Sequence, residues 1–88
     1  MDETSATAAF EAFLLRKEKE TGEPLLRVPM PSQRLSAGWA FYYQSRAYLE
    51  TKDFRAMLVG QGPVVIRDDG RIIEGGSLDR DPESLLTR

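Results

Sequence analysis

Residues 38–70 read GWAFYYQSRAYLETKDFRAMLVGQGPVVIRDDG, and this stretch decides the fold. Its opening segment, 38–45, is rich in aromatic residues that recur at every second position, which predicts a β-strand. Trp39, Phe41 and Tyr43 then point to one side of that strand. Because bulky aromatic side chains favour burial, we expect that side to be the core face.

The other end of this stretch predicts a β-hairpin. Apolar runs over 63–67 and 71–74 flank the pair Asp69-Gly70, which is typical of a two-residue turn whose central positions both need positive φ. A two-residue turn places Ile66 opposite Ile73 and directs both side chains to the core face. The sheet is therefore expected to be antiparallel.

A helix is expected ahead of the sheet, over residues 4–21. Its apolar side chains recur at helical spacing: Ala6, Ala9, Phe10, Phe13 and Leu14. Gly22 supplies a stop signal, and Pro24 prevents continuation of the helix. Packed on the sheet, this helix predicts one core cluster with the following members: Phe10, Phe13, Trp39, Phe41 and Ile66.

Shorter elements and links account for most other residues. Residues 25–30 predict an edge strand in which apolar side chains alternate with Arg27 and Pro29, and a second proline, Pro31, follows directly. Its apolar positions are Leu26, Val28 and Met30. Residues 32–37 are expected to form a loop and 46–52 an irregular link, whereas Asp53 begins a short helix that ends at Gly60.

Together these elements predict a single α+β domain over residues 1–88. An N-terminal helix packs on one face of a three- to four-stranded antiparallel sheet, and a short helix lies between the aromatic strand and the C-terminal hairpin. Residues 77–88 fit either a frayed tail or one helical turn. A chain of 88 residues has a small core with little room for a deep active-site pocket.

Composition argues against several classes of function. The chain has no cysteine and no histidine, which removes disulfides, thiolate chemistry, the commonest general base and the commonest transition-metal ligand. The formal net charge is −2 with no basic block, so we expect no nucleic-acid partner. No apolar run approaches about 18 residues, so we expect no membrane span. The opening residues lack a basic n-region, and we expect a cytoplasmic protein.

Motifs that carry chemistry are weak in this chain. Gly60 and Gly62 suggest a phosphate loop, but no lysine follows them and the order of helix and strand is reversed. The acids after residue 67 lack the spacing of a calcium loop. Two carboxylates facing each other across a cleft, as hydrolysis needs, are not indicated by the sequence. We therefore expect no enzymatic activity, no cofactor and no metal.

The order of motifs within residues 38–76 points to a family. In order, the chain carries Gly38-Trp39, Phe41-Tyr42-Tyr43-Gln44-Ser45, Tyr48-Leu49-Glu50-Thr51-Lys52-Asp53, Gly60-Gln61-Gly62-Pro63, Val64-Val65-Ile66 and Asp69-Gly70. In order and spacing this pattern resembles the YrhB-like family, also described as the immunity-35 family of bacterial polymorphic toxin systems. The chain departs from that pattern at Lys52, Gln61 and Asp69, where glycine, asparagine and threonine are usual.

The resemblance implies a non-catalytic immunity role, in which the protein binds a toxin made by the same cell and blocks it. A chaperone-like activity is associated with one branch of the family, so a chaperone-like or general interaction module is the alternative. Neither role brings catalytic residues with it. The expected partner is a protein, a cognate toxin on the first interpretation, and the oligomeric state stays open.

A partner-binding face is expected on the side of the sheet away from the helix. In the predicted register this face presents Tyr42, Val65, Arg67, Ile72 and Glu74, with Gln44 at its margin. Tyrosine and aliphatic residues ringed by opposite charges resemble an interface core with a polar rim. In an alternative arrangement, the C-terminal Leu85-Leu86 segment covers this face.

Overall fold

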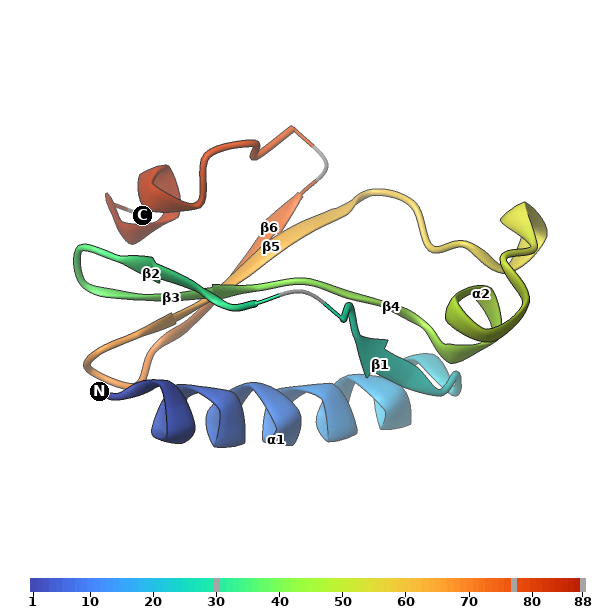
Figure 1. Cartoon of the computed structure of the whole chain (residues 1–88), viewed down its shortest axis with the longest axis horizontal. Coiled ribbons are helices and arrows are strands. Elements are labelled where there is room, and N and C mark those ends of the chain that lie inside the picture. Colours follow the sequence, from blue (N-terminus) through green and yellow to red (C-terminus); the bar gives the residue numbers. More distant parts are fainter. Residues whose placement is uncertain (30, 77, 88) are drawn as a thin grey trace.

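A computed structural model describes residues 1–29, 31–76 and 78–87. In chain order the elements are α1 (Glu3–Thr21), β1 (Leu25–Arg27), β2 (Gln33–Leu35), β3 (Gly38–Phe41), β4 (Tyr43–Ser45), α2 (Arg46–Thr51), the 3₁₀ turn η1 (Phe54–Ala56), β5 (Gln61–Arg67), β6 (Ile72–Gly76) and the 3₁₀ segment η2 (Pro82–Thr87). The predicted α+β fold, with an N-terminal helix packed on an antiparallel sheet, is confirmed (Figure 1).

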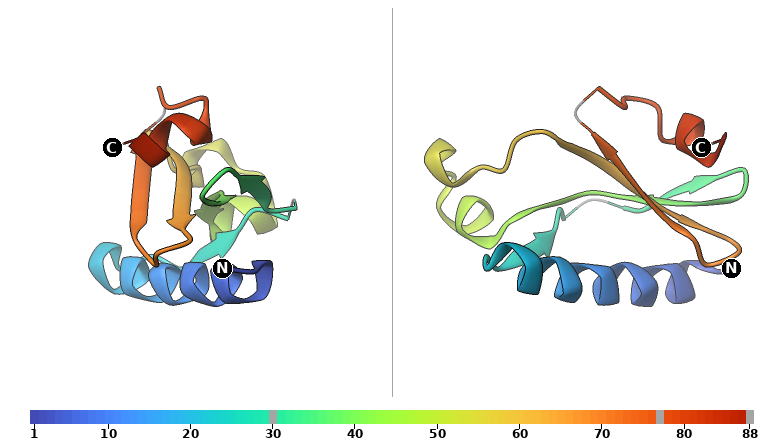
Figure 2. Two further views of the ribbon diagram at one scale, coloured as in Figure 1. Left: turned by 90° about the vertical axis from the view of Figure 1, so that its left-hand side faces the viewer. Right: turned by 180° about the vertical axis from the view of Figure 1, so that it is seen from behind.

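The strands form two antiparallel sheets. The larger has four strands in the order β2-β3-β5-β6, and β1 pairs with β4 in the smaller. The predicted aromatic strand over 38–45 is split at Tyr42, because β3 pairs with β5 whereas β4 pairs with β1. The larger sheet lies between α1 on one side and η2 on the other (Figure 2).

α1 matches the predicted helix closely. Asp2 caps its start, where the carboxylate Oδ1 accepts a hydrogen bond from the backbone N–H of Ser5 at 2.8 Å. Gly22 ends it at a φ of 73°, a left-handed conformation in which glycine has no Cβ to crowd the backbone. The buried side chains of the helix are Ala6, Phe10, Phe13 and Leu14.

The predicted core cluster is confirmed on the α1 side of the sheet. Phe10 is fully buried and stacks on Phe41, with ring centroids 4.6 Å apart. Phe13 also belongs to the cluster, and the ring of Trp39 packs against it while remaining half-buried. Ile66 completes the predicted set and is fully buried.

A smaller cluster lies on the opposite face of the sheet. Leu85 of η2 is fully buried there, in one cluster with Leu35, Ala40 and Val65. The alternative arrangement, in which the C-terminal segment covers this face, is therefore the one observed. Of the tail expected over 77–88, Ser77 and Arg88 lie outside the described residues, and η2 accounts for much of the rest.

The predicted two-residue turn is wrong, and the register of the hairpin differs by one residue. Arg67 and Arg71 close a three-residue loop, and Val65 faces Ile73 while Ile66 faces Ile72. Only Gly70 within the loop takes positive φ, at 92°, whereas the predicted turn needs it at two successive positions. The shift puts Ile72 rather than Ile73 on the α1 side.

Three expectations about links are also wrong. β2 occupies half of the expected loop over 32–37 and pairs with β3. α2 replaces the expected irregular link, because the Ser45 hydroxyl caps it by accepting a hydrogen bond from the Tyr48 N–H at 3.0 Å. The short helix predicted between the aromatic strand and the hairpin is present as α2, but its expected position from Asp53 to Gly60 is wrong, since only the 3₁₀ turn η1 forms there.

The predicted edge strand over 25–30 is shorter than expected, and its buried leucine is Leu25 rather than Leu26. β1 stops at Arg27, and Met30 lies outside the described residues. Leu25 is 3% exposed and Leu26 is 41% exposed, so the two leucines face in opposite ways. Leu25 pairs with the fully buried Ser45, which fixes the core side of the strand and leaves Leu26 outside.

Lys52 ends α2 in the left-handed region with a φ of 59°. A side chain with a Cβ is crowded in this conformation by roughly 1–2 kcal/mol, a strain that glycine avoids. Lys52→Gly should therefore raise the free energy of unfolding by about 0.5–1 kcal/mol after its more flexible unfolded chain is counted. Urea denaturation measures the effect. Lys52→Ala keeps the Cβ and should bring no gain; equal stabilisation by both variants would contradict this explanation.

Candidate protein-interaction surface

The six residues predicted to bind a partner do not share one open face. Val65 is fully buried beneath the C-terminal segment, in the cluster of Leu85. Ile72 and Glu74 lie on the α1 side, because the observed hairpin register turns β6 over relative to the predicted one. The premise of an open sheet face is therefore wrong, whereas contact of the six residues with a partner stays a prediction.

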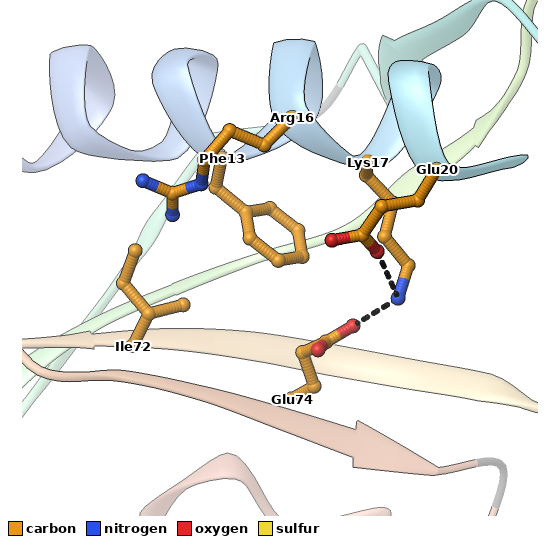
Figure 3. A pocket seen from close by; sticks show the side chains of 6 residues that line it. All are labelled: Phe13, Arg16, Lys17, Glu20, Ile72 and Glu74. Atoms are coloured by element: carbon orange, nitrogen blue, oxygen red, sulfur yellow. Dashed lines mark ion pairs between the residues drawn. The ribbon is translucent and has the colours of Figure 1, made fainter.

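Glu74 joins β6 to α1 through an ion pair. Its Oε1 lies 2.9 Å from the Nζ of Lys17, which also lies 3.9 Å from a carboxylate oxygen of Glu20 (Figure 3). The hydrogen bond with Glu74 raises the pKa of Lys17. A hollow of about 230 Å³ lies here, with Phe13 and Ile72 on its walls. The charges that line this hollow neutralise each other. The ion pair between Lys17 and Glu74 therefore serves to hold α1 on the hairpin.

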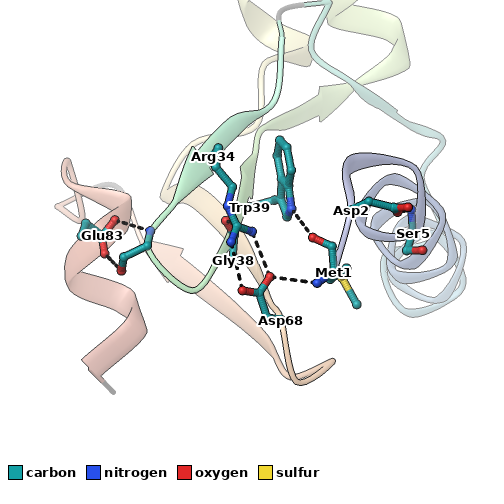
Figure 4. A network of polar contacts seen from close by, with 9 residues as sticks. Met1, Asp2, Ser5, Arg34, Gly38, Trp39, Asp68 and Glu83 are labelled. Atoms are coloured by element: carbon teal, nitrogen blue, oxygen red, sulfur yellow. Dashed lines mark hydrogen bonds and ion pairs between the residues drawn. The ribbon is translucent and has the colours of Figure 1, made fainter.

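Arg67 and Glu83 attach η2 to the rest of the chain. The Arg67 guanidinium donates a hydrogen bond to the backbone carbonyl of Leu86 and another to the Asp69 carboxylate. The Glu83 carboxylate accepts hydrogen bonds from the backbone N–H and the hydroxyl of Ser36, in the turn between β2 and β3 (Figure 4). Arg67 therefore has a structural task in the monomer.

Gln44 also has a structural task. Its side-chain Oε1 accepts hydrogen bonds from the N–H groups of Leu58 at 2.6 Å and of Ser45 at 2.8 Å. Its Nε2 donates to the Leu58 carbonyl at 3.2 Å. The side-chain amide thus bonds both backbone groups of Leu58, as a neighbouring strand would, and fixes the segment after η1 against β4. Tyr42 is half-buried at the break between β3 and β4.

A polar network joins the hairpin loop to β2 and to the start of the chain (Figure 4). The Arg34 guanidinium donates two hydrogen bonds to the Asp68 carboxylate, from Nη1 at 2.9 Å and from Nη2 at 3.1 Å. The Met1 ammonium lies 3.5 Å from the same carboxylate, and the Trp39 indole donates to the Met1 carbonyl at 3.1 Å. The pairing with Arg34 lowers the pKa of Asp68 from its usual 3.8.

Asp68 should make the protein sensitive to acid. Because its pKa is lower in the folded state, its stabilisation is complete above the unfolded value of 3.8 and is lost as the pH falls through the folded value. We expect the melting temperature to hold down to about pH 5 and to fall below it, and Asp68→Asn should flatten part of that fall. Thermal unfolding of both proteins between pH 7 and about pH 2 measures this. Parallel curves would show that Asp68 does not contribute.

Exposed apolar side chains gather where α1 meets β1. Leu15 is 62% exposed and Leu26 is 41% exposed. They lie on a hollow of about 480 Å³, here called the α1–β1 groove, which is lined by Glu11, Leu14, Leu15, Glu18, Leu25, Leu26 and Arg27. The sequence prediction missed it because it named Leu26 only as an apolar position of the edge strand and assigned no side of that strand to the surface. The one available signal was Leu15, an apolar residue outside the predicted core face of the helix.

A second group of exposed apolar side chains lies in η1 and in the segment that follows it. Phe54, the first residue of η1, is 77% exposed, and Val59, in the segment that follows η1, is 80% exposed. The ring of Phe54 leans on Tyr48, with centroids 6.3 Å apart. These residues protrude and line none of the hollows described above, so they supply contact area without a shaped recess.

The site residues point to binding rather than to chemistry. Within residues 1–29, 31–76 and 78–87, acidic side chains do not gather in a group of three suited to a metal ion. Each carboxylate drawn in Figure 4 is already used: Asp2 caps α1, Asp68 pairs with Arg34, and Glu83 accepts hydrogen bonds from Ser36. What the surface offers is apolar area with charged borders, as protein interfaces do.

A family model for immunity protein 35 matches residues 4–84. The chain belongs to the immunity protein 35 family. The match runs from α1 into η2 and confirms the resemblance found in the sequence. Comparisons with curated proteins and with solved structures gave no match.

Immunity protein 35 members belong to toxin systems and are typically non-catalytic, which agrees with the prediction from composition. The left-handed position of Lys52 also explains why glycine is usual there in the resembled pattern. None of the helices in the described part of the chain has both the length and the apolar character that a membrane crossing needs.

Proposed function

We propose that this immunity protein 35 member binds a cognate bacterial toxin and neutralises it, in the cytoplasm of the cell that makes the toxin. The family match over residues 4–84 is the observation that carries the proposal. One feature of the surface supports it: the apolar side chains exposed at the α1–β1 groove. Binding that covers the toxin's working surface is sufficient for such a role.

The test begins with the toxin gene next to the gene for this chain. Expression of that toxin alone should arrest growth of a sensitive host, and co-expression of this chain should restore it. The purified pair should form a complex by gel filtration and by isothermal titration calorimetry. A toxin of the same chemistry from an unrelated locus is the matched control and should be neither bound nor neutralised.

A chaperone-like role predicts a different result. In that case the chain would suppress aggregation of unrelated unfolded proteins and would bind the neighbouring toxin no better than the control toxin. Protection that is specific for the neighbouring toxin supports the immunity role, and general suppression without specific binding would overturn it.

Among the six predicted residues, Tyr42 is the one we infer to meet the toxin. The Val28 N–H donates to its carbonyl at 3.0 Å, so the ladder of β1 and β4 continues to it. Strand alternation then places Tyr42 on the side of Gln44, whose partner across the ladder is the exposed Leu26.

Tyr42→Ala should weaken toxin binding by about tenfold or more, with a small change in melting temperature. Arg67→Glu is the contrasting variant, because loss of its hydrogen bond to Leu86 should lower the melting temperature. Calorimetric titration and thermal unfolding separate the two effects. Unchanged affinity of the Tyr42 variant would remove this residue from the interface.

A further inference from the structure

The α1–β1 groove runs along the edge of a strand. Leu25 and Leu26 are neighbours in β1, so their side chains point to opposite faces. Both nevertheless line the same hollow, together with Leu14 and Leu15 of α1. A hollow reached from both faces of a strand lies beside its edge, and among the described residues this edge of β1 carries no further strand (Figure 1).

The outer edge of β1 presents backbone groups to the groove. Hydrogen bonds from Arg46 to Pro24 and from Val28 to Tyr42 show that even-numbered residues of this segment point to β4. Leu25 and Arg27 therefore direct their backbone groups away from β4. The Leu25 N–H confirms the direction, since it donates to the carboxylate of Glu18, on the groove wall, at 2.8 Å.

The groove has an acidic border. A second hollow shares Glu11 and Arg27 with it, and a third shares Glu18, so the recess continues along α1 in both directions. Four acids and two bases line its whole course: Glu3, Glu11, Glu18, Glu23, Lys19 and Arg27. The Arg27 guanidinium lies 4.9 Å from the ring centroid of Phe41, which holds this positive charge against the protein.

We propose that an extended, basic segment of the toxin docks in the α1–β1 groove as an added strand beside β1. Its backbone pairs with the carbonyl of Leu25, whose N–H is already bonded to Glu18, and with the outward groups of Arg27, the mode of recognition in which a peptide extends a sheet. An apolar side chain of the segment rests on Leu15, and lysine or arginine residues flank it. This inference rests on the proposed function for the nature of the occupant.

The spacing of the groove defines the segment. Glu11 and Glu18 are seven residues apart on α1, which is roughly 10 Å along a helix axis. Two basic residues separated by three others on a strand lie about 13 Å apart, within reach of both acids through their long side chains. The pattern is therefore basic-x-apolar-x-basic. Pro24 and Pro29 flank β1 and limit the pairing to its few residues.

The groove is tested with synthetic peptides and two-dimensional NMR of the labelled full chain. Acetyl-TKTLTKT-amide carries the pattern and should shift the amide signals of Leu25, Leu26 and Arg27 and of the α1 residues near Glu11, with saturation. The charge-reversed TETLTET should bind about tenfold more weakly. A peptide with methylated amide nitrogens cannot donate to a strand and should not shift β1. Shifts elsewhere, or equal binding of all three peptides, would overturn the proposal.

Substitutions in the groove test whether the toxin binds at the same site as the peptide. Leu26→Arg and Glu11→Lys should each weaken both peptide and toxin binding by about tenfold, because they place positive charge where a basic segment docks. Leu78→Arg is the matched control, since Leu78 is 90% exposed and does not line the groove. Glu11 is an exposed helical position, so its variant is expected to fold even if Leu26→Arg does not.

The two proposals fail in different ways. Toxin bound equally well by wild type and by both groove variants would keep the immunity function and overturn the docking site. If the protein binds the peptide in the groove but does not bind the neighbouring toxin, the groove remains a site for basic segments, and the proposal that the toxin occupies it is overturned.

Discussion

Phe10→Ala should lower the free energy of unfolding by about 3–5 kcal/mol. The ring of Phe10 is fully buried between those of Phe13 and Phe41, with centroid distances of 6.1 and 4.6 Å. Its removal leaves a cavity between α1 and the sheet, which the neighbouring rings fill only in part. A chain of 88 residues is expected to be stable by roughly 4–13 kcal/mol, so this loss is a large share of the total.

Urea denaturation of Phe10→Ala against Leu15→Ala measures the effect. Both variants place alanine on the same helix, where the better helix propensity of alanine offsets a small part of the loss in each, but Leu15 is 62% exposed. Leu15→Ala should change stability by no more than about 0.5 kcal/mol. Similar losses in the two variants would mean that the helix does not pack on the sheet through this face.

Leu85→Ala should have the second largest effect, a loss of about 2–5 kcal/mol. Leu85 is fully buried against Val65, which is itself fully buried in the sheet. Truncation of its side chain removes the main apolar contact by which η2 covers the second face. We therefore expect the amides of η2 to exchange with solvent faster in the variant, in addition to the loss of global stability.

Leu78→Ala is the control for this variant. Leu78 is 90% exposed in the same C-terminal part of the chain, and its truncation should leave stability within about 0.5 kcal/mol of wild type. Thermal unfolding of both variants, together with hydrogen exchange of the η2 amides, measures the difference. If Leu85→Ala melts like Leu78→Ala, the cover over the second face contributes little to stability.

The parts of the fold that were predictable from sequence are those with a long periodic signal. The helix over 4–21 carries five apolar residues at helical spacing, and the aromatic strand alternates over three. Both signals survive small errors in the boundaries. The packing of Phe10 on Phe41 followed from them directly, whereas Ile66 was added from the apolar run over 63–67.

The register of the hairpin was beyond sequence prediction because it depends on the φ of one residue. Asp69-Gly70 fits a two-residue turn only if Asp69 takes positive φ, and in the structure Gly70 alone within the loop does so. A shift of one residue moves every side chain of β6 to the other face. For this reason Ile72 and Glu74 both lie on the α1 side and not on the predicted binding face.

The candidate groove was hidden for a related reason. β1 has three residues, too few for a period to reveal which of Leu25 and Leu26 is buried. The buried leucine of η2 had no periodic neighbours either, so its packing on Val65 could be offered only as an alternative. In both cases tertiary contacts, rather than local propensity, decide the outcome.

The position of η2 bears on how the protein folds. All strands of the larger sheet precede η2 in the chain, and the face that carries Ala40 and Val65 is covered only when η2 docks on it. A folding intermediate in which the α1 side has its cover but η2 has not docked therefore leaves this second face bare. Intermediates with bare apolar sheet faces tend to associate with one another. Docking of η2 thus protects each copy from its neighbours during folding.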